Sequence, residues 1–446
     1  MSEGYSLNSG HLLAAGTASA SSAIRKISLN ILLVADVSIA SVIGGAERVL
    51  FEQSTRLAKR GHDVHILTRR LPEHDSDMEI IQGVREWRFY LPDLKFCPFL
   101  KSTFLNCRSL FYDLQEKFSF DIINFHQPFT ALGVLSSKAA RGIPRVYTCH
   151  SLSFEEFASR SSSPQNSKEW ASYRLQLFGR KLAEKALLGK SNRIVVLSEY
   201  TREKVLRKYG LSEAKVEIIP GAVSLTRFSV SENKSAIRRR LGIPENCFVL
   251  LTIRNLVPRM GLENLIMALQ LVVEKRKDIL LTLGGEGPLS KKLQDMARDA
   301  GVDNFVRFTG FIPEKELPSY YQMADLFILP TKDLEGFGMV IVEALASGLP
   351  VLGTPVGGTK EILALLGPEF LFADSTPASM AKLILKNIEL WNRDSEIRRN
   401  VSQKCRDIAE RYYSWDTHID QLEELFQRMA YRSNNTGKEE RKLRHL

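Results

Sequence analysis

Short apolar runs alternate with longer amphipathic stretches along the first half of the chain. Five of these runs predict strands, at residues 31–34, 64–68, 122–125, 146–148 and 194–197. Runs that are apolar throughout are typical of parallel strands covered on both faces. Between the first two, residues 45–60 place Val49, Leu50 and Leu57 on one helical face, and Gly61 is expected to end the helix.

The same alternation restarts after a charged linker at residues 229–240. Five further strands are predicted, at residues 248–253, 279–283, 306–309, 326–329 and 351–353. One helical stripe between the first two consists of Leu262, Leu265, Ile266, Leu269, Val272 and Val273. A last amphipathic helix presents Ile419, Leu422, Leu425, Phe426 and Met429. The pattern predicts an α/β protein with two successive, Rossmann-like, doubly wound sheets.

The length of 446 residues fits two large domains. We expect a mobile N-terminal tail at residues 1–27, a first domain at 28–225, a second domain at 226–395, helices at 396–430 that cross back to the first domain, and a basic tail at 431–446. Ligands of such sheets bind beyond the carboxyl ends of the strands. The site is therefore expected in the cleft between the domains.

Composition narrows the class of protein. The chain is 44% hydrophobic and 25% charged, which is ordinary for a soluble protein, and no apolar run is long enough for a membrane span. The five cysteines are scattered and the start resembles no secretory signal, so we expect reduced thiols and a cytoplasmic protein. The net charge is +10, of which +8 falls in residues 1–225. Without a basic helix or an aromatic ladder typical of nucleic-acid modules, no nucleic-acid partner is expected.

The densest chemical signal lies between residues 330 and 343. A strand is expected to end at Pro330, and a loop follows with Glu335 and Gly338 before a helix that carries Glu343. Glycines let the backbone approach a ligand closely, and the free N–H groups of a helix N-terminus suit a diphosphate. Carboxylates suit sugar and ribose hydroxyls. On spacing alone, a glycine-rich turn with a capping glutamate remains an alternative.

This segment resembles the E-x7-E signature of the retaining glycosyltransferases of family GT4, which have the GT-B fold. Further segments also match the family pattern: Gly44-Gly45-Ala-Glu47, Gly284-Gly-Glu-Gly287-Pro288, Gly310-Phe311, Tyr321-Gln-Met-Ala324-Asp325, Ala344-Leu-Ala-Ser-Gly348-Leu-Pro350-Val351 and Thr354-Pro-Val-Gly357-Gly358-Thr359-Lys-Glu361. The resemblance covers about residues 28–430. It implies a GT-B fold with two domains facing each other across a cleft, and a nucleotide-sugar donor.

The resemblance also implies roles for single residues. Donor-binding positions are Gly45, Gly285, Glu286, Phe337, Gly338, Met339, Val340 and Glu343. Glu335 is expected beside the donor sugar as a catalytic residue, and Glu343 at the ribose. His126 matches a histidine near the reaction centre, although a structural role is an alternative for it. Gly44 and His150 are expected to line the cleft, and a structural role is equally open for His150.

Two departures from the family pattern affect this prediction. The family usually carries an arginine and, five residues later, a lysine, where this chain has Asn255 and Met260. Arg254 and Arg259 stand one residue earlier with the same spacing, and we expect them to stabilise the leaving diphosphate as catalytic cations. The alternative is two solvated arginines on a loop. Ser224 replaces a frequent aspartate in a segment that joins the domains.

Residues 87–114 mix aromatic side chains with Arg88, Lys95, Lys101 and Arg108. Either these aromatics pack beneath the first domain, or the patch rests on an anionic membrane surface while a lipid-linked acceptor enters the cleft. The second reading places the protein peripherally on the cytoplasmic face of a membrane.

The sequence thus predicts a retaining, metal-independent hexosyltransferase without a cofactor. Its substrates are a nucleoside-diphosphate sugar and a hydroxyl acceptor, such as a glycan, a lipid-linked glycan or a small hydroxyl compound, in polysaccharide or glycolipid biosynthesis. Two alternatives stay open, a nucleotide-sugar epimerase of the same fold and a non-catalytic partner subunit. The nucleotide base, the sugar and the acceptor are not determined.

Overall fold

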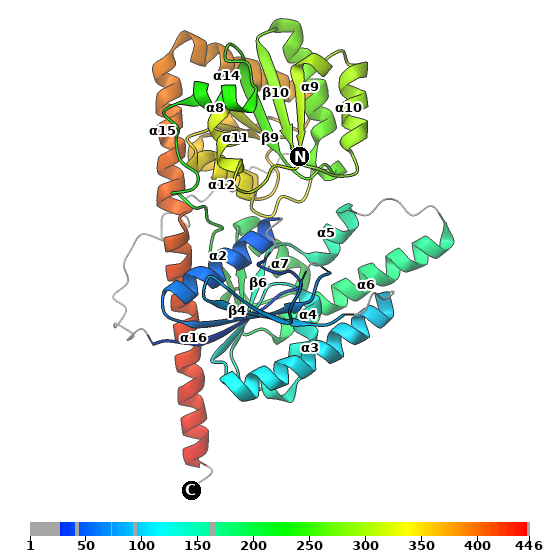
Figure 1. The fold of residues 1–446 in the computed structure, drawn as a ribbon, viewed down its shortest axis with the longest axis vertical. Coiled ribbons are helices and arrows are strands. Elements are labelled where there is room, and N and C mark those ends of the chain that lie inside the picture. Colours follow the sequence, from blue (N-terminus) through cyan, green and yellow to red (C-terminus); the bar gives the residue numbers. More distant parts are fainter. Residues whose placement is uncertain (1–26, 41–43, 73, 92–95, 161–165, 444–446) are drawn as a thin grey trace, which may run out of the picture.

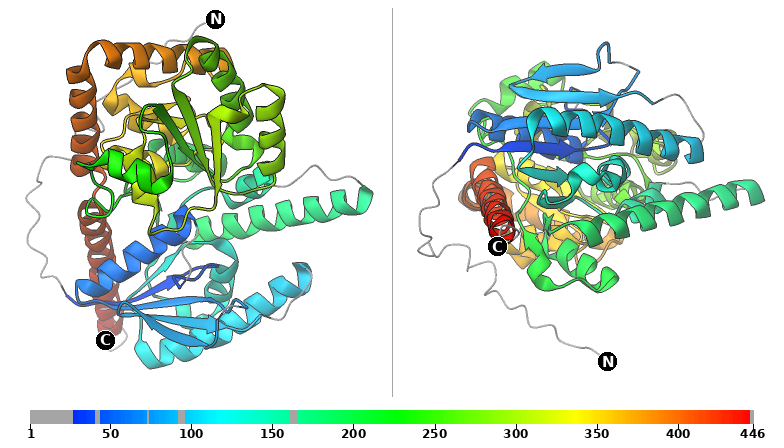
Figure 2. Two further views of the ribbon diagram at one scale, coloured as in Figure 1. Left: turned by 45° about the horizontal axis from the view of Figure 1, so that its top comes forward. Right: turned by 90° about the horizontal axis from the view of Figure 1, so that it is seen from below.

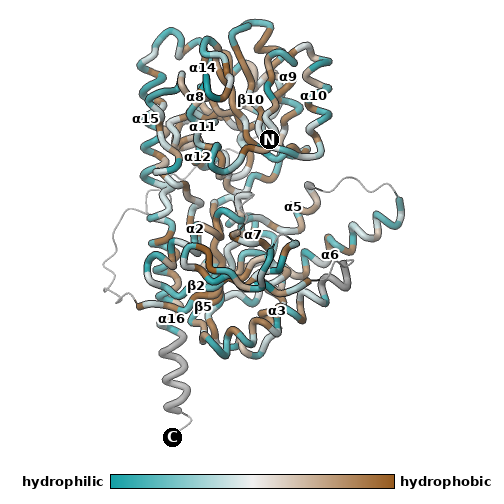
Figure 3. Tube along the Cα trace, in the orientation of Figure 1, coloured by the Kyte–Doolittle hydropathy of each residue, from teal (hydrophilic) through white to brown (hydrophobic). Residues whose placement is uncertain are grey.

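The computed structural model describes residues 27–40, 44–72, 74–91, 96–160 and 166–443, and the chain forms two α/β units stacked end to end (Figure 1). Residues 1–26 of the tail predicted at 1–27 and the last three residues lie outside this description. Hydrophobic segments concentrate in the strands of both units (Figure 3).

The first unit contains an eight-stranded sheet in the order β3-β4-β2-β1-β5-β6-β7-β8. Its strands are β1 Asn30–Val34, β2 Asp63–Arg69, β3 Met78–Ile81, β4 Val84–Phe89, β5 Ile122–Phe125, β6 Arg145–Cys149, β7 Arg193–Val196 and β8 Val216–Ile218. Every neighbouring pair is parallel except β3 and β4. In the central strand, Ile31 pairs with Val64 on one side and with Ile122 on the other.

Helices cover both faces of this sheet. They are α2 Gly45–Lys59, α3 Phe96–Phe118, α4 Pro128–Ser136, α5 Ser153–Arg160, α6 Ser167–Lys190 and α7 Glu199–Tyr209. Side chains alternate along β1, so Leu32 joins the core beneath α3, α4 and α6, while Ile31 and Leu33 join the core beneath α2. The buried faces of these helices therefore follow from the period-two alternation of the strand.

The second unit contains a parallel five-stranded sheet in the order β11-β10-β9-β12-β13. Its strands are β9 Phe248–Ile253, β10 Ile279–Gly284, β11 Val306–Gly310, β12 Leu326–Leu329 and β13 Val351–Gly353. Its helices are α8 Lys234–Leu241, α9 Leu262–Lys275, α10 Ser290–Asp299, α11 Leu317–Met323, α12 Met339–Ala346, α13 Gly358–Leu366, α14 Pro377–Arg393 and α15 Ser395–Tyr412. One hydrophobic core joins these elements.

The last helix, α16 Trp415–Leu443, leaves the second unit and runs along the first (Figure 1). The predicted apolar face is confirmed, because Ile419, Leu422, Leu425 and Phe426 are buried in the core that contains Ile31. The helix continues to Leu443, into residues for which a basic tail is expected.

All ten predicted strands are confirmed within two residues at each end. Three strands escaped prediction, β3, β4 and β8. Met78 and Ile80 of the edge strand β3 are exposed, and β4 interleaves its apolar positions with Arg85, Glu86 and Arg88, so neither strand forms an apolar run. Strand β8 has only three residues.

Among the described residues, no helix combines the length and the apolar character that crossing a bilayer requires. Cys107, Cys149, Cys247 and Cys405 are free thiols, as predicted. The side chain of Cys97 lies outside the description.

Candidate active site between the two units

The loop between β12 and α12 brings the first predicted carboxylate into the cleft. Glu335 is buried and its Oε2 accepts hydrogen bonds from Arg254 Nη2 at 2.5 Å and from Thr331 Oγ1 at 3.2 Å. Gly338 has a φ of 92° at the N-terminus of α12, a left-handed conformation that favours glycine. The residue before Glu335, Leu334, also has a positive φ, of 58°, which is the kind of local strain that functional loops hold.

A pair of glycines fixes the path of this loop. A Cβ on Gly357 would lie 2.0 Å from the Glu335 carbonyl oxygen, and one on Gly358 would lie 2.8 Å from the Gly336 carbonyl oxygen. The Gly358 N–H donates to the Glu335 carbonyl at 2.9 Å. A side chain is thus excluded at both positions where the backbones meet, which explains the glycine pair Gly357-Gly358 within the motif.

The shifted arginines separate into different positions. The Arg254 guanidinium faces Glu335 and also contacts the Met260 sulfur, at 2.7 Å from Nη2. Arg259 Nη1 instead donates to the Leu334 carbonyl at 2.8 Å, so it supports the loop backbone. Asn255, at the position of the family arginine, is exposed. The structure therefore brings Arg254, and not Arg259, to the predicted carboxylate.

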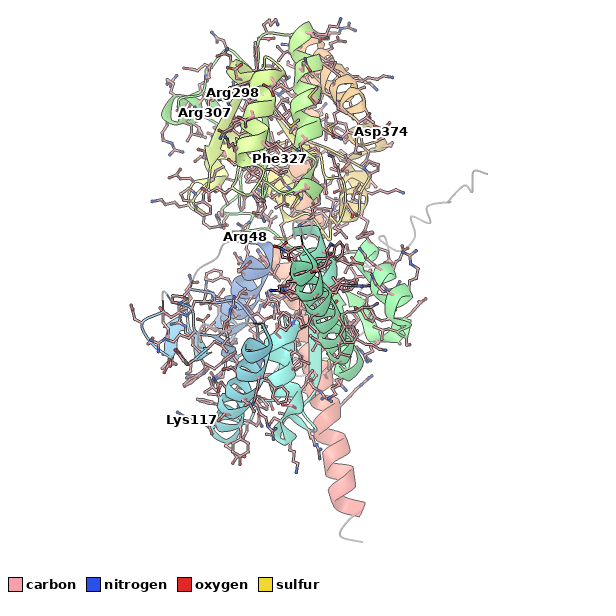
Figure 4. The ribbon with its side chains drawn as sticks, turned by 90° about the vertical axis from the view of Figure 1, so that its right-hand side faces the viewer. Arg48, Lys117, Arg298, Arg307, Phe327 and Asp374 are labelled. Carbon is pink, nitrogen blue, oxygen red and sulfur yellow. The ribbon has the colours of Figure 1, made fainter. Side chains whose placement is uncertain are left out.

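The second predicted carboxylate, Glu343, is occupied by protein groups. Its Oε2 accepts from the Tyr321 hydroxyl at 2.7 Å, and its Oε1 pairs with Arg48 of α2. Arg48 also pairs with Glu314, which in turn pairs with Arg227 at 2.6 Å. Arg48 thus joins the two units beside the end of α2 (Figure 4).

Neither Arg48 nor Tyr321 was singled out by the sequence reasoning. A signal existed for Arg48, since it directly follows the Gly44–Glu47 segment in the first turn of α2. Arginine is common on helix surfaces, however, and its partners lie more than 260 residues away.

The glycine segment of the first unit lies against α12. A Cβ on Gly45 would lie 3.7 Å from Met339 Cγ, while Gly44 is the N-cap residue of α2. Phe337 is buried against Tyr413, with ring centroids 5.7 Å apart, and Val340 is half-buried. The first turn of α12 therefore faces Gly45, whereas the Phe337 ring serves packing.

The other predicted donor-binding segment stands at the end of β10. A Cβ on Gly285, whose φ is 119°, would lie 1.9 Å from the Arg254 carbonyl oxygen. The Glu286 carbonyl accepts from the Leu256 N–H at 2.8 Å, and its side chain is exposed. Gly285 thus fixes the backbone next to Arg254.

The two predicted histidines meet at the carboxyl ends of β5 and β6. His126 Nδ1 and His150 Nε2 lie 3.1 Å apart, and Asn124 lies 3.2 Å from the other His126 nitrogen. Burial lowers the pKa of His126 well below its ordinary value and lowers the pKa of His150 to about 4. Both rings are therefore neutral near pH 7 and are joined by one hydrogen bond.

Hydrogen bonds hold the start of α7 in the first unit to the loop before α12 and to α13 of the second unit. The Ser198 hydroxyl donates to the Gly336 carbonyl at 2.5 Å, and the Glu361 carboxylate accepts the N–H groups of Glu199 and Tyr200 at 2.8 and 2.6 Å. Desolvation raises the pKa of Glu361. The N-terminus of α7 thus interacts with a carboxylate from α13 of the other unit.

One arginine of the first unit was not singled out by the sequence reasoning. Arg180 of α6 is held between the rings of Phe129 and Phe157, with centroid distances of 4.9 and 4.5 Å. Its Nε has no hydrogen-bond partner among the described residues, and burial lowers its pKa. Asp36, at the end of β1, is near enough to act on this charge.

The aromatic and apolar residues of the predicted patch at residues 87–114 fall into a buried group and an exposed group. Phe89 and Phe111 are buried in the core, which supports packing for those two. Tyr90, Leu105 and Tyr112 are exposed. In the described chain, no group of three or more histidine, cysteine, aspartate or glutamate side chains is placed to hold a metal ion.

Two successive Rossmann-like sheets, with Glu335 in the loop before α12 and Glu343 within that helix, place the chain in the GT-B class of glycosyltransferases. Residues 43–227 match the model described as Glycosyltransferase Family 4, and residues 233–406 match the one described as Glycosyl transferases group 1. The chain belongs to family GT4, and it is a glycosyltransferase of the GT-B type.

Relatives with named substrates differ from one another. A GDP-mannose-dependent alpha-(1-6)-phosphatidylinositol monomannoside mannosyltransferase of Mycolicibacterium smegmatis is 37% identical over 175 residues, which is 38% of this chain and 45% of that protein. The chain therefore spans less than half of that relative. Mannosylfructose-phosphate synthase of Agrobacterium fabrum is 26% identical over 74% of this chain and 75% of its own length.

Among solved structures, a sucrose-phosphate synthase from Thermosynechococcus elongatus superimposes with a TM-score of 0.74 at 21% identity, covering 90% of this chain and 98% of that one. At this identity the likeness concerns the fold.

Proposed function

We propose that this protein transfers a hexose-like sugar from a nucleoside-diphosphate sugar to a hydroxyl acceptor, with retention of configuration at the anomeric carbon. The observation that carries this proposal is the buried Glu335–Arg254 pair, which stands where the glycine segment of the first unit meets α12. The bond from the anomeric carbon to the diphosphate oxygen breaks, the bond to the acceptor oxygen forms, and the acceptor proton passes to the departing diphosphate.

Each polar group has a task in this scheme. Glu335 accepts hydrogen bonds from sugar hydroxyls, and Glu343 accepts them from the ribose once Arg48 gives way. The Arg254 guanidinium stabilises negative charge that grows on the leaving diphosphate, in a setting that excludes water. His126, being neutral, donates or accepts a hydrogen bond near the sugar and does not act as a cationic acid.

We propose further that the acceptor carries a phosphate or a similar anion. Arg180 supports this, because two aromatic rings hold its guanidinium on the acceptor side while its Nε lacks a partner among the described residues. The names of the mannosylfructose-phosphate and phosphatidylinositol mannoside relatives also include phosphorylated compounds. Arg180→Gln should raise the KM for a phosphorylated acceptor without changing the affinity for the nucleotide.

The donor proposal is tested by thermal unfolding with UDP, GDP, ADP and their sugars. A ligand present at about 100 times its dissociation constant stabilises the native state by about 2.7 kcal/mol. Absence of a shift with every one of these nucleotides would refute the donor site. Glu335→Gln should transfer almost no sugar at temperatures where it is folded, and it should unfold at a lower temperature than the native protein because the buried Arg254 guanidinium loses its charged partner.

We also propose that turnover needs no divalent metal, since a fixed guanidinium supplies the positive charge. Transfer is then unchanged by EDTA, and loss of activity that manganese restores would overturn this. Incubation of donor without acceptor separates transfer from epimerisation, because only an epimerase changes the sugar configuration of the donor. A non-catalytic partner subunit would bind the nucleotide-sugar donor but would neither transfer nor hydrolyse its sugar.

A further inference from the structure

Helix α6 projects from the first unit, and its N-terminal half lies apart from the body of the protein (Figures 1 and 2). Four large apolar side chains on it are exposed to about half or more: Trp170 at 50%, Leu175 at 50%, Phe178 at 66% and Leu182 at 57%. Single exposed apolar residues are common, but four on one helix form a patch that indicates an interaction surface.

Cations interleave with these apolar side chains. The basic residues of the same surface are Lys168, Arg174, Lys181 and Lys185, all exposed. At 100° per residue, these four and the four apolar residues fall within an arc of about 160°. Glu169 lies outside this arc, and Glu184 is buried on the opposite face. The outward face of α6 is thus basic and aromatic without an acidic residue.

Helix α3 extends this surface. Helices α3 and α6 both pack against α4 and project on the same side of the first unit (Figure 2). The outward side chains of α3 include Lys101, Leu105, Arg108 and Tyr112. An apolar hollow of about 420 Å³ between α3 and α4 is lined by Lys101, Phe104, Leu105, Phe129 and Leu132.

We propose that this α3–α6 surface docks on an anionic lipid bilayer. Basic amphipathic helices with aromatic residues lie at the membrane interface, with apolar side chains among the lipid tails and cations at the headgroups. A second copy of the chain would bring cations against cations, which disfavours self-association through this face. The committed partner is therefore a membrane surface that carries negative charge.

The hollow between α3 and α4 adjoins Arg180, which lies on the inward side of α6, about 160° around the helix from the centre of the exposed arc. Arg180 belongs to α6, and Phe129, which stacks on Arg180, also lines the hollow between α3 and α4. A bilayer against α3 and α6 would bring a lipid-linked acceptor to the hollow, which would take part of its chain on the side of Phe129 away from the exposed arc. This step rests on the proposed transferase function, whereas membrane docking itself does not.

Trp170 provides a direct readout of docking. The chain has four tryptophans, and within the described residues Trp87, Trp391 and Trp415 are buried or half-buried while Trp170 is exposed. We expect the fluorescence of the full chain to shift to shorter wavelength with vesicles containing 30% phosphatidylglycerol in phosphatidylcholine. Pure phosphatidylcholine should give a much smaller shift, and raised salt should weaken binding.

Substitutions separate this face from general surface effects. Replacing two cations in Lys181→Ala/Lys185→Ala should weaken vesicle binding about 30-fold, at the usual contribution of a lysine near an anionic membrane. The matched control, Lys382→Ala/Lys386→Ala, removes two exposed lysines with the same spacing from α14 of the second unit. Phe178→Ser should weaken binding as well, with Leu390→Ser on α14 as its control.

Equal loss in both lysine pairs would show nonspecific attraction and overturn the proposal. So would the absence of binding to anionic vesicles, or concentration-dependent dimerisation that Phe178→Ser abolishes. Nucleotide binding measured on the same samples keeps the outcomes apart. A chain that binds donor but not vesicles refutes membrane docking alone, and a chain that binds vesicles but no nucleotide refutes the transferase proposal alone.

Discussion

At the residue scale, the main question is which positively charged side chain stabilises the diphosphate of the donor. The family arginine and lysine positions hold Asn255 and Met260, yet the structure places a guanidinium at Glu335 from the neighbouring position, Arg254. Arg254 directly follows β9, and its backbone N–H still donates to the Gly284 carbonyl at the end of β10. This hydrogen bond fixes the backbone of Arg254 at the carboxyl end of the sheet, where its side chain reaches Glu335. A shift by one residue thus changes the identity of the cation and keeps a positive charge beside the carboxylate.

Arg254→Ala should lower kcat by about 10²–10³-fold, because a fixed donor to the transition-state charge is lost. Arg254→Lys should recover part of this, and Arg259→Ala should cost less, because Arg259 contacts the Leu334 carbonyl rather than Glu335. Steady-state kinetics together with thermal unfolding of each variant measures the effect. Equal losses in the two alanine variants would contradict the assignment.

Arg48 leads to a second prediction at this scale. Because its guanidinium pairs with the carboxylate proposed for the ribose, a nucleotide must displace it. Arg48→Ala should therefore tighten binding of the nucleoside diphosphate several-fold in isothermal titration. Arg227→Ala is the control, since it removes a partner of Glu314 without freeing Glu343. Weaker nucleotide binding in Arg48→Ala would show instead that Arg48 contacts the nucleotide.

At the element scale, the donor loop is held by close backbone contacts between three segments. The α12 loop, the turn before α13 and the N-terminus of α7 meet at Gly336 and Gly357, with hydroxyl and carboxylate groups supplying the remaining hydrogen bonds. A loop held on three sides is pre-organised, which lowers the cost of positioning Glu335.

Gly357→Ala tests this arrangement. The new Cβ would meet the Glu335 carbonyl at 2.0 Å in a left-handed conformation, so the unfolding free energy should fall by about 2–4 kcal/mol and transfer should decline with it. Gly189→Ala is the matched control, because Gly189 lies in α6 with no atom near its Cβ. That change should stabilise by about 0.5–1 kcal/mol. Chemical denaturation measures both, and a neutral Gly357→Ala would refute the close contact.

At the scale of the whole molecule, α16 follows the second unit in sequence and is anchored to the first unit through a buried histidine. His418 Nδ1 lies 2.6 Å from the Pro220 carbonyl, and its Nε2 lies 2.8 Å from Gln53 of α2. Burial lowers the pKa of His418 to about 4, as it does for His150. The helix that crosses between the units is thus fixed by a neutral imidazole.

These histidines predict a dependence of stability on pH. Their unfolded pKa is about 6.5, so between pH 6.5 and 4 the unfolded chain binds more protons and stability falls as the pH falls, by about 3 kcal/mol for each ring. Glu184 acts in the opposite sense, because burial raises its pKa to about 7 and stability is lost as the pH rises from about 4.5 to 7.

Wild type and His418→Gln both contain Glu184, so the contribution of Glu184 to the pH dependence cancels when the two proteins are compared. We expect His418→Gln to lose less stability than wild type from pH 7 to 5 by denaturant unfolding, and parallel curves would contradict the buried neutral ring.

The sequence by itself determined the two doubly wound units and the loop of paired carboxylates. Buried parallel strands must be apolar along their whole length, and glycines are required where backbones touch, so both leave local marks such as residues 122–125 and Gly357-Gly358. Strands β3 and β4 interrupt their apolar positions with exposed or charged residues and β8 has only three residues, so these three strands carry no such mark and were missed.

Only the tertiary structure decided which charges meet. Arg254 and Arg259 have equal standing along the chain, but the fold turns one to Glu335 and the other to a backbone carbonyl. Arg48 reaches Glu343, and Phe129 and Phe157 enclose Arg180, across long separations in sequence. Pairing of distant side chains depends on the approach of whole helices, and the exposed face of α6 depends on what the fold leaves uncovered, so neither is written in local spacing.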